Sequence, residues 1–120
     1  MPNQYALVIE DEPSIRRTVA IFLRGIGFET LTAPDAPSAR RLLEYIRPDV
    51  IIADERLPGE TGHALIDDLR ERPELAPTPV VLMSAYGEPA DHRADEFLAK
   101  PFDPDLLELA IRRHLPENGK

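Results

Sequence analysis

The sequence predicts an α/β domain in which helices cover both faces of a parallel β-sheet. Short, continuous apolar runs rich in β-branched residues are typical of strands that are buried on both faces. These runs alternate with segments whose apolar residues recur at helical spacing. The strands are therefore expected to be parallel, because each connection is long enough for a crossover. Right-handed crossovers place the carboxyl ends of the strands at one edge, where open α/β sheets bind their ligands.

The first half of the chain is expected to form a strand, a helix, a strand and a helix. The continuously apolar run over residues 5–9 predicts a buried strand. Pro13 suits a first helical turn, and the apolar residues after it recur at helical spacing until two glycines stop the helix. A short strand over 28–32 is expected near the sheet edge. Asp35 then caps a second helix, which Pro48 ends.

The second half repeats this alternation around a central strand over residues 50–54, a buried run that ends in an acid. A Pro-Gly loop follows, and apolar residues at helical spacing predict a third helix over about 62–72. Further apolar runs predict a fourth strand over 79–83 and a short fifth strand over 96–98. Residues 103–104, an Asp-Pro pair, start the last helix.

The composition indicates one domain of 120 residues, with a core over about 4–115 and a tail over 116–120. The chain has 14 Lys and Arg against 22 Asp and Glu, a net charge of −8, which argues against direct binding to nucleic acid. The absence of cysteine excludes disulfides, thiolate metal sites and cysteine nucleophiles. No signal-peptide pattern or apolar run of membrane-spanning length is present, so we expect a cytoplasmic protein without membrane insertion.

Polar residues follow four different strands and are expected to meet at one edge of the sheet: Glu10, Asp11, Asp54, Ser84 and Lys100. Three carboxylates held close together repel one another, so their ionisation in a partly buried site calls for a cation. A set of oxygen ligands favours Mg²⁺, held by one or two carboxylates and several waters. A metal, a lysine and a hydroxyl are the groups that phosphoryl transfer needs. Asp54, alone on the central strand, is best placed to attack and form an aspartyl phosphate.

These residues resemble the motifs of the response-regulator receiver domain. The matching pieces, in chain order, are LVIEDEPS over 7–14, DVIIAD over 49–54, LPG over 57–59, SA over 84–85 and KPF over 100–102. Each piece alone is a weak signal, but together they span nearly the whole chain in the family's order. The resemblance implies a flavodoxin-like (βα)5 fold, a doubly wound sheet of five parallel strands in the order 2-1-3-4-5.

The resemblance also implies roles for the acidic residues and Arg56. Asp54 would be the phosphoacceptor, and its partner would be a sensor histidine kinase or a histidine phosphotransfer protein. Asp54 and Asp11 would bind Mg²⁺ directly, Glu10 would act through water, and the backbone carbonyl of Arg56 would be a further ligand. Any chemistry would be self-phosphorylation and self-dephosphorylation at most, so no other enzymatic activity is expected.

Four further residues have implied roles in the response to phosphate. Lys100 would pair with the phosphoryl oxygens, and the Lys100–Pro101 peptide bond is expected to be cis. Ser84 would move to bond the phosphoryl group, and Phe97 would turn inward with it. Tyr86, together with Arg56, falls at the positions that tune how long the phosphate survives.

The segment over residues 85–99 departs from the family pattern. It must contain the fifth strand, and Gly87 and Pro89 open it, so little more than one turn of helix remains. We predict a truncated fourth helix or a mobile, partly exposed loop in its place. The face beside this helix usually carries the output, so the downstream partner and homodimer formation stay open. The length leaves no room for an output domain: we expect a stand-alone receiver, a phosphate shuttle or a piece of a longer protein.

Other functions would account for parts of the same pattern. The acids at 10–12 taken alone could simply cap the first helix, and in a flavodoxin-like cofactor binder they would repel the phosphate. A haloacid-type phosphatase would need a second aspartate at position 56, where this chain has Arg56. The main alternative is a receiver-like interaction module that is never phosphorylated. Thr61 and Gly62 are expected only to cap the third helix, and the histidines at 63, 92 and 114 lack metal-ligand spacing and are expected at the surface.

Overall fold

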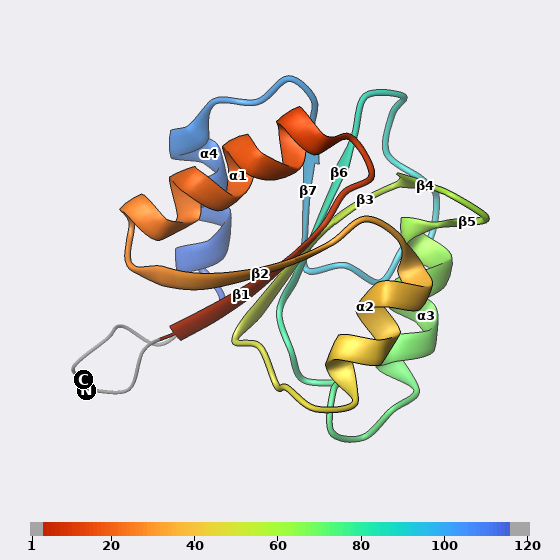
Figure 1. The fold of residues 1–120 in the computed structure, drawn as a ribbon. Coiled ribbons are helices and arrows are strands. Elements are labelled where there is room, and N and C mark those ends of the chain that lie inside the picture. The colour runs from red at the N-terminus through yellow and green to blue at the C-terminus, as the bar shows by residue number, and fades with distance from the viewer. Residues whose placement is uncertain (1–3, 116–120) are drawn as a thin grey trace.

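A five-stranded parallel sheet of order β2-β1-β3-β6-β7 lies at the centre of the structure, a computed structural model that describes residues 4–115 (Figure 1). The elements are β1 Gln4–Ile9, α1 Pro13–Gly25, β2 Phe28–Ala33, α2 Ala36–Leu43, β3 Val50–Asp54, β4 Arg56–Leu57, β5 Glu60–Thr61, α3 Gly62–Arg70, β6 Val80–Ser84, β7 Glu96–Ala99 and α4 Pro104–Arg112. Counted along the main sheet, this order is the predicted 2-1-3-4-5. The short strands β4 and β5 form a separate antiparallel ladder. The tail predicted over 116–120 lies outside the described residues.

The continuous apolar runs are explained by two hydrophobic cores, one on each face of the sheet. In β3, Ile51 and Ala53 pack toward α2 and α3, whereas Val50 and Ile52 pack toward α1 and α4. Figure 1 shows the same two helix pairs on opposite faces. Every residue of β3 is buried, and burial of each large aliphatic side chain contributes about 1.5–3 kcal/mol. The central strand is therefore held firmly from both sides.

The helix starts follow the predicted caps. The side chains of Asp35, Thr61 and Asp103 accept hydrogen bonds from backbone N–H groups in the first turns of α2, α3 and α4, at 2.8, 3.2 and 2.8 Å. Each cap satisfies a donor that the helix itself cannot pair. The helices begin beyond the carboxyl ends of the strands, so these caps also fix where the loops at that edge end.

Two helix ends differ from the prediction. Helix α2 ends at Leu43, although a hydrogen bond from Ile46 N–H to the Leu42 carbonyl (3.0 Å) continues the turn beyond it. Helix α3 ends at Arg70 rather than 72, because Arg72 N–H bonds the carbonyl three residues back (3.1 Å) and tightens the last turn. Both differences lie far from the ligand-binding edge of the sheet.

The segment between β6 and β7 contains no helix over its described residues 85–95, as the sequence predicted. Arg70 of α3 anchors the adjoining backbone: its guanidinium donates to the carbonyls of Ala76 and Thr78 (both 2.8 Å) and of Arg93 (3.0 Å). It also pairs with Asp95 at 2.8 Å. The loop is thus held at its base while residues 85–88 are exposed.

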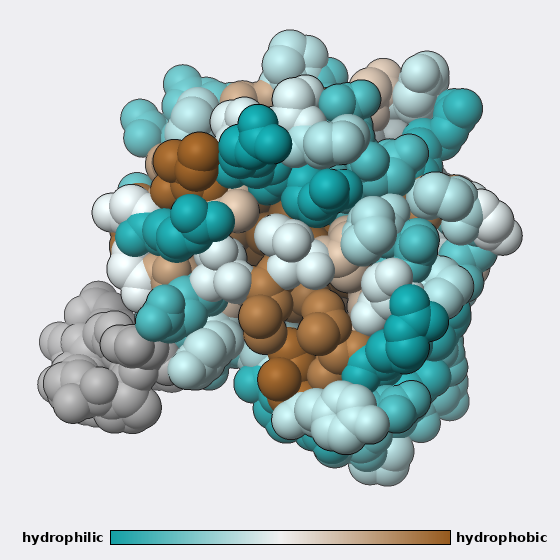
Figure 2. All heavy atoms as spheres, in the orientation of Figure 1, coloured by the Kyte–Doolittle hydropathy of each residue, from teal (hydrophilic) through white to brown (hydrophobic). Residues whose placement is uncertain are grey.

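The outer surface in the view of Figure 2 is mostly hydrophilic, with a group of hydrophobic side chains below β2 and beside α2 and a smaller hydrophobic area over α1. Among residues 4–115, no helix is long and apolar enough to cross a membrane.

Candidate functional site

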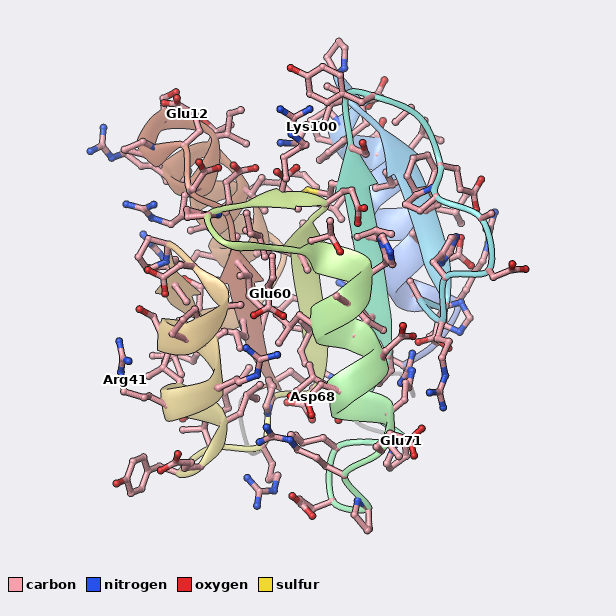
Figure 3. The ribbon with its side chains drawn as sticks, turned by 90° about the vertical axis from the view of Figure 1, so that its right-hand side faces the viewer. Glu12, Arg41, Glu60, Asp68, Glu71 and Lys100 are labelled. Carbon is pink, nitrogen blue, oxygen red and sulfur yellow. The ribbon has the colours of Figure 1, made fainter. Side chains whose placement is uncertain are left out.

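The structure brings the predicted polar residues together at the carboxyl ends of the strands. Oxygen atoms of Glu10, Asp11 and Asp54 lie within 4.8 Å of one another. Ser84 ends β6 and is 1% exposed, and Lys100 follows β7 directly. Figure 3 shows Lys100 at the same end of the sheet as the residues that follow β1. One edge therefore gathers the whole set that the sequence identified.

Lys100 lies between two of the carboxylates. Its Nζ is 2.7 Å from Glu10 Oε1 and 2.6 Å from Asp54 Oδ1. The side chains of Glu10, Asp54 and Lys100 are only 2, 5 and 15% exposed. Buried charges of this kind need partners, because water cannot solvate them. The ammonium group supplies one positive charge to a site with three carboxylates.

Burial and pairing shift the pKa values of Glu10 and Lys100 in this arrangement. Burial raises the pKa of Glu10 above its ordinary value, and the charge of Asp54 adds to this rise, while hydrogen bonds from Lys100 and the Glu12 N–H oppose it. Burial also disfavours the charged form of Lys100, but hydrogen bonds to Asp54 and Glu10 outweigh it, and the pKa of Lys100 rises. The lysine is thus held in its charged form beside a carboxylate whose charge is costly to bury.

The three consecutive acids after β1 have different tasks. Glu12 caps α1, because its Oε1 accepts from Ser14 N–H (3.3 Å) and Ser14 Oγ (3.0 Å). Asp11 is exposed, and Glu10 is buried with its carboxylate toward Lys100. The capping interpretation therefore holds for Glu12 alone, and the other two acids belong to the cluster.

The second oxygen of Asp54 is held by the loop that follows β3. Asp54 Oδ2 accepts a hydrogen bond from the backbone N–H of Arg56 at 3.0 Å. The guanidinium of Arg56 stacks over the exposed ring of Tyr86, 4.4 Å from its centroid, and Tyr86 N–H donates to Ser84 Oγ at 3.0 Å. The two predicted tuning residues are therefore in direct contact, and each is also tied to a residue of the site.

The remaining sequence expectations concern Phe97 and the peptide bond after Lys100. Phe97 is partly buried and packs against the core on the α2 and α3 face, with its ring centroid 6.2 Å from that of His92. The Lys100–Pro101 bond is cis, as predicted. The histidines expected at the surface, His63, His92 and His114, have side chains that are 37, 12 and 31% exposed, and each ring is paired with a glutamate, so His92 is clearly less exposed than expected.

The sequence did not reveal the contacts that Gly62, Glu55 and His63 make near Asp54. A Cβ on Gly62 would overlap the backbone carbonyl oxygen of Asp54, so this glycine allows α3 to pack against the end of β3 in addition to its place after the cap. Glu55 is buried beside the acceptor, and its carboxylate accepts from the backbone and ring of His63. Only the small size of residue 62 could have suggested the first contact, and no local pattern pairs residues 55 and 63.

The donor set fits a hard divalent cation. The cluster offers only carboxylate oxygens. Arg56, whose backbone carbonyl is predicted to be a further ligand, is bound to Asp54 Oδ2 through its backbone N–H. Mg²⁺ prefers oxygen ligands and keeps several waters. The exposure of Asp11 leaves one side of the cluster open to water and to phosphate oxygens.

Comparison with known proteins agrees with this geometry. A model of the response regulator receiver domain matches residues 6–112. Protein PetR of Rhodobacter capsulatus is 37% identical over 122 residues, which cover 94% of this chain and 50% of PetR. The chain spans about half the length of the curated relatives it matches.

Solved structures show the same fold. The chemotaxis response regulator CheY4 of Vibrio cholerae is similar with a TM-score of 0.86 at 29% identity, covering 95% of this chain and all of CheY4. The receiver domain of the sensor histidine kinase PA1611 from Pseudomonas aeruginosa, solved with a magnesium ion in its active-site cleft, has a TM-score of 0.86 at 26% identity, covering 94% of this chain and 98% of that domain. The fold, the motifs and the family match together place this chain in the response regulator receiver domain family of two-component systems.

Proposed function

We propose that the chain is a phosphorylation switch in which Asp54 accepts a phosphoryl group, with Mg²⁺ bound by Glu10, Asp11, Asp54 and the Arg56 carbonyl. The observation that carries this proposal is the position of Asp54. It is a buried carboxylate at the end of the central strand, within 2.6 Å of an ammonium group and within reach of two further acids. This is an arrangement for neutralising charge on a transferred phosphoryl group.

The proposed donor is a phosphohistidine of a sensor histidine kinase or a histidine phosphotransfer protein. A carboxylate oxygen of Asp54 attacks phosphorus, the P–N bond breaks, and its electron pair returns to the imidazole. Mg²⁺ would supply positive charge against the phosphoryl oxygens. Lys100 exchanges part of its contact with Asp54 for those oxygens, since its Nζ lies beside the attacking atom.

A groove beside the site suits the partner that presents the phosphohistidine. It has a volume of about 490 Å³ and is lined largely by apolar side chains of α1 and of the segment from Lys100 to Leu107. Lys100 lines this groove and also binds Asp54. A helix seated there would therefore bring its reactive side chain toward the acceptor and pack against apolar lining residues such as Val19 and Phe22.

The response to phosphate begins at Ser84. Its hydroxyl oxygen accepts from Tyr86 N–H and still has a hydrogen to donate. A phosphoryl oxygen on Asp54 would attract that hydrogen, and movement of Ser84 would pull on Tyr86 and the exposed start of the 85–95 loop. Phe97, which packs beside this loop, would follow. Phosphate adds charge and acceptor oxygens at one point, and the loop converts the change into a new surface.

Intact mass spectrometry with a small-molecule phosphodonor tests the proposal. We expect an adduct that requires Mg²⁺, is absent from Asp54→Asn and is retained by Asp49→Asn, which changes the carboxylate that precedes the same strand. An adduct that survives Asp54→Asn would show that another residue is the acceptor.

The loop in place of a fourth helix favours a second candidate function, a receiver-like interaction module that binds its partner without phosphate. That candidate predicts no adduct under any of these conditions and a partner affinity that Asp54→Asn leaves unchanged.

A further inference from the structure

Glu55 lies between two residues of the proposed metal site, Asp54 and Arg56. Its backbone N–H donates to the Met83 carbonyl of β6 at 2.8 Å, and its carbonyl accepts from Gly62 N–H at 2.8 Å. The main chain of Glu55 is thus fixed on one side by the neighbouring strand and on the other by the start of α3.

The side chain of Glu55 is fixed as well. Its Oε1 accepts from the backbone N–H of His63 at 2.9 Å, and its Oε2 lies 2.6 Å from His63 Nδ1. A carboxylate only accepts, so the ring nitrogen is the donor in this second bond. Glu55 is 8% exposed, and its side chain extends toward α3, whereas the oxygens of Asp54 extend toward Lys100 and Arg56. Three of the four hydrogen bonds of Glu55 therefore reach the first two residues of α3.

Close packing leaves this junction little freedom. Gly62 lies so near the Asp54 carbonyl that a Cβ would not fit between them. The three atoms that such a Cβ would meet first all belong to the backbone of Asp54 and Glu55. The distance between the Asp54 carboxylate and the Arg56 carbonyl depends on the backbone of the single residue between them. Whatever fixes Glu55 therefore fixes the relative position of two proposed metal ligands.

We propose that Glu55 and His63 are positioning residues of the metal site, holding the main chain so that the Asp54 carboxylate and the Arg56 carbonyl face the same cation. This inference rests on the proposed function, because it concerns the same site. Outer residues that orient metal ligands contribute about 10- to 100-fold to metal affinity. Since Glu55 acts through the backbone, we expect the lower end, about 10-fold.

His63→Ala separates positioning from simple electrostatics. Removal of the ring leaves the Glu55 carboxylate without its side-chain partner and adds no positive charge near the site, so electrostatics alone predicts Mg²⁺ binding that is equal to the wild type or tighter. Positioning predicts the opposite, because one of the bonds that hold Glu55 is lost. His63→Asn restores a side-chain N–H at the place of Nδ1 and should recover most of the affinity.

The experiment is a Mg²⁺ titration followed by backbone amide NMR, without any phosphodonor. We expect a dissociation constant about 10-fold higher in His63→Ala than in the wild type, and one near the wild-type value in His63→Asn. Asp49→Ala is the matched control: Asp49 Oδ2 also accepts a backbone N–H, that of Tyr5 at 2.7 Å, but just before β3 at the opposite edge of the sheet. Its Mg²⁺ affinity should not change.

Each other outcome overturns the inference in a distinguishable way. Equal or tighter binding by His63→Ala refutes positioning while leaving the proposed function intact. Equal weakening in Asp49→Ala would show that loss of stability, and not the junction, lowers affinity. A wild-type protein without any Mg²⁺ response would refute the metal site and the inference together. If His63→Ala does not fold, Glu55→Gln decides: it keeps an acceptor for His63 N–H while it removes one negative charge. Positioning then predicts a Mg²⁺ dissociation constant near the wild-type value, and one about 10-fold higher contradicts it.

Discussion

Gly62→Ala should destabilise the domain although it adds only one methyl group at the first position of a helix. The added Cβ would overlap the Asp54 carbonyl oxygen and lie 3.0 Å from the Asp54 carbonyl carbon and 3.1 Å from Glu55 Cα. All three atoms belong to the backbone, so no side-chain rotation relieves the contact.

The neighbouring backbone cannot move away without breaking other contacts. Asp54 is paired with Met83 in the central part of the sheet, and Glu55 N–H bonds the Met83 carbonyl. Helix α3 must therefore shift, although Leu65, Ile66 and Leu69 bury it against the sheet. Overpacking of this kind costs about 1–3 kcal/mol. We expect about 2–3 kcal/mol because the atoms on both sides are fixed, and a fall in the melting temperature of roughly 10 °C.

Urea unfolding followed by far-UV circular dichroism measures this change. Gly25→Ala is the matched control, because Gly25 is the last residue of α1 and a Cβ there would meet nothing within 4 Å. That variant should be as stable as the wild type or more stable by about 0.4–1 kcal/mol. The reasoning is refuted if Gly62→Ala unfolds at the same urea concentration as the wild type or the control.

Two further predictions concern the ion pairs of α2 and α3. Arg40 holds the pKa of both Glu60 and Asp68 below their ordinary values, and Figure 3 shows these two acids on neighbouring elements. Arg40→Met should therefore lower the free energy of unfolding by about 1 kcal/mol at neutral pH. This difference should disappear as the pH falls below the unfolded-state pKa values of roughly 4 and through the lower folded-state values. A difference in urea stability that does not change with pH would contradict this. Arg70→Ala should lower the free energy of unfolding by about 3 kcal/mol, because three backbone carbonyls and Asp95 lose a charged donor. Amide hydrogen exchange over residues 85–95 should become faster, with Arg70→Lys intermediate between Arg70→Ala and the wild type. Unchanged exchange rates in Arg70→Ala would contradict the role of Arg70 as an anchor.

The sheet and most of the site could be predicted because they depend on local patterns. Continuous apolar runs required strands with two buried faces, and Val50 to Ala53 alternate between the two cores as such a run must. Strand-end acids then had to meet at one edge. The shortness of the 85–95 segment likewise excluded a full helix before any geometry was known.

Contacts between distant residues could not be predicted in the same way. The close approach of Gly62 to Asp54 depends on how α3 packs, and a glycine at a helix start can equally serve the turn that precedes it. The pairing of Glu55 with His63 joins two residues eight positions apart through a turn that no periodicity describes. The contact of Arg56 with Tyr86 joins loops after two different strands, so only the assembled sheet shows that they meet.

The most direct test of the central claim is the amide NMR spectrum on addition of Mg²⁺ and beryllofluoride, which mimics an aspartyl phosphate. We predict shifts at Asp54 that spread to Ser84, Phe97 and the 85–95 loop, and none of these beryllofluoride-dependent shifts in Asp54→Asn. A spectrum that changes only at the acidic cluster would leave a phosphoacceptor without a switch. A spectrum that does not change at all, in the wild type as in the variant, would contradict the account and leave a receiver fold that acts through its surface alone.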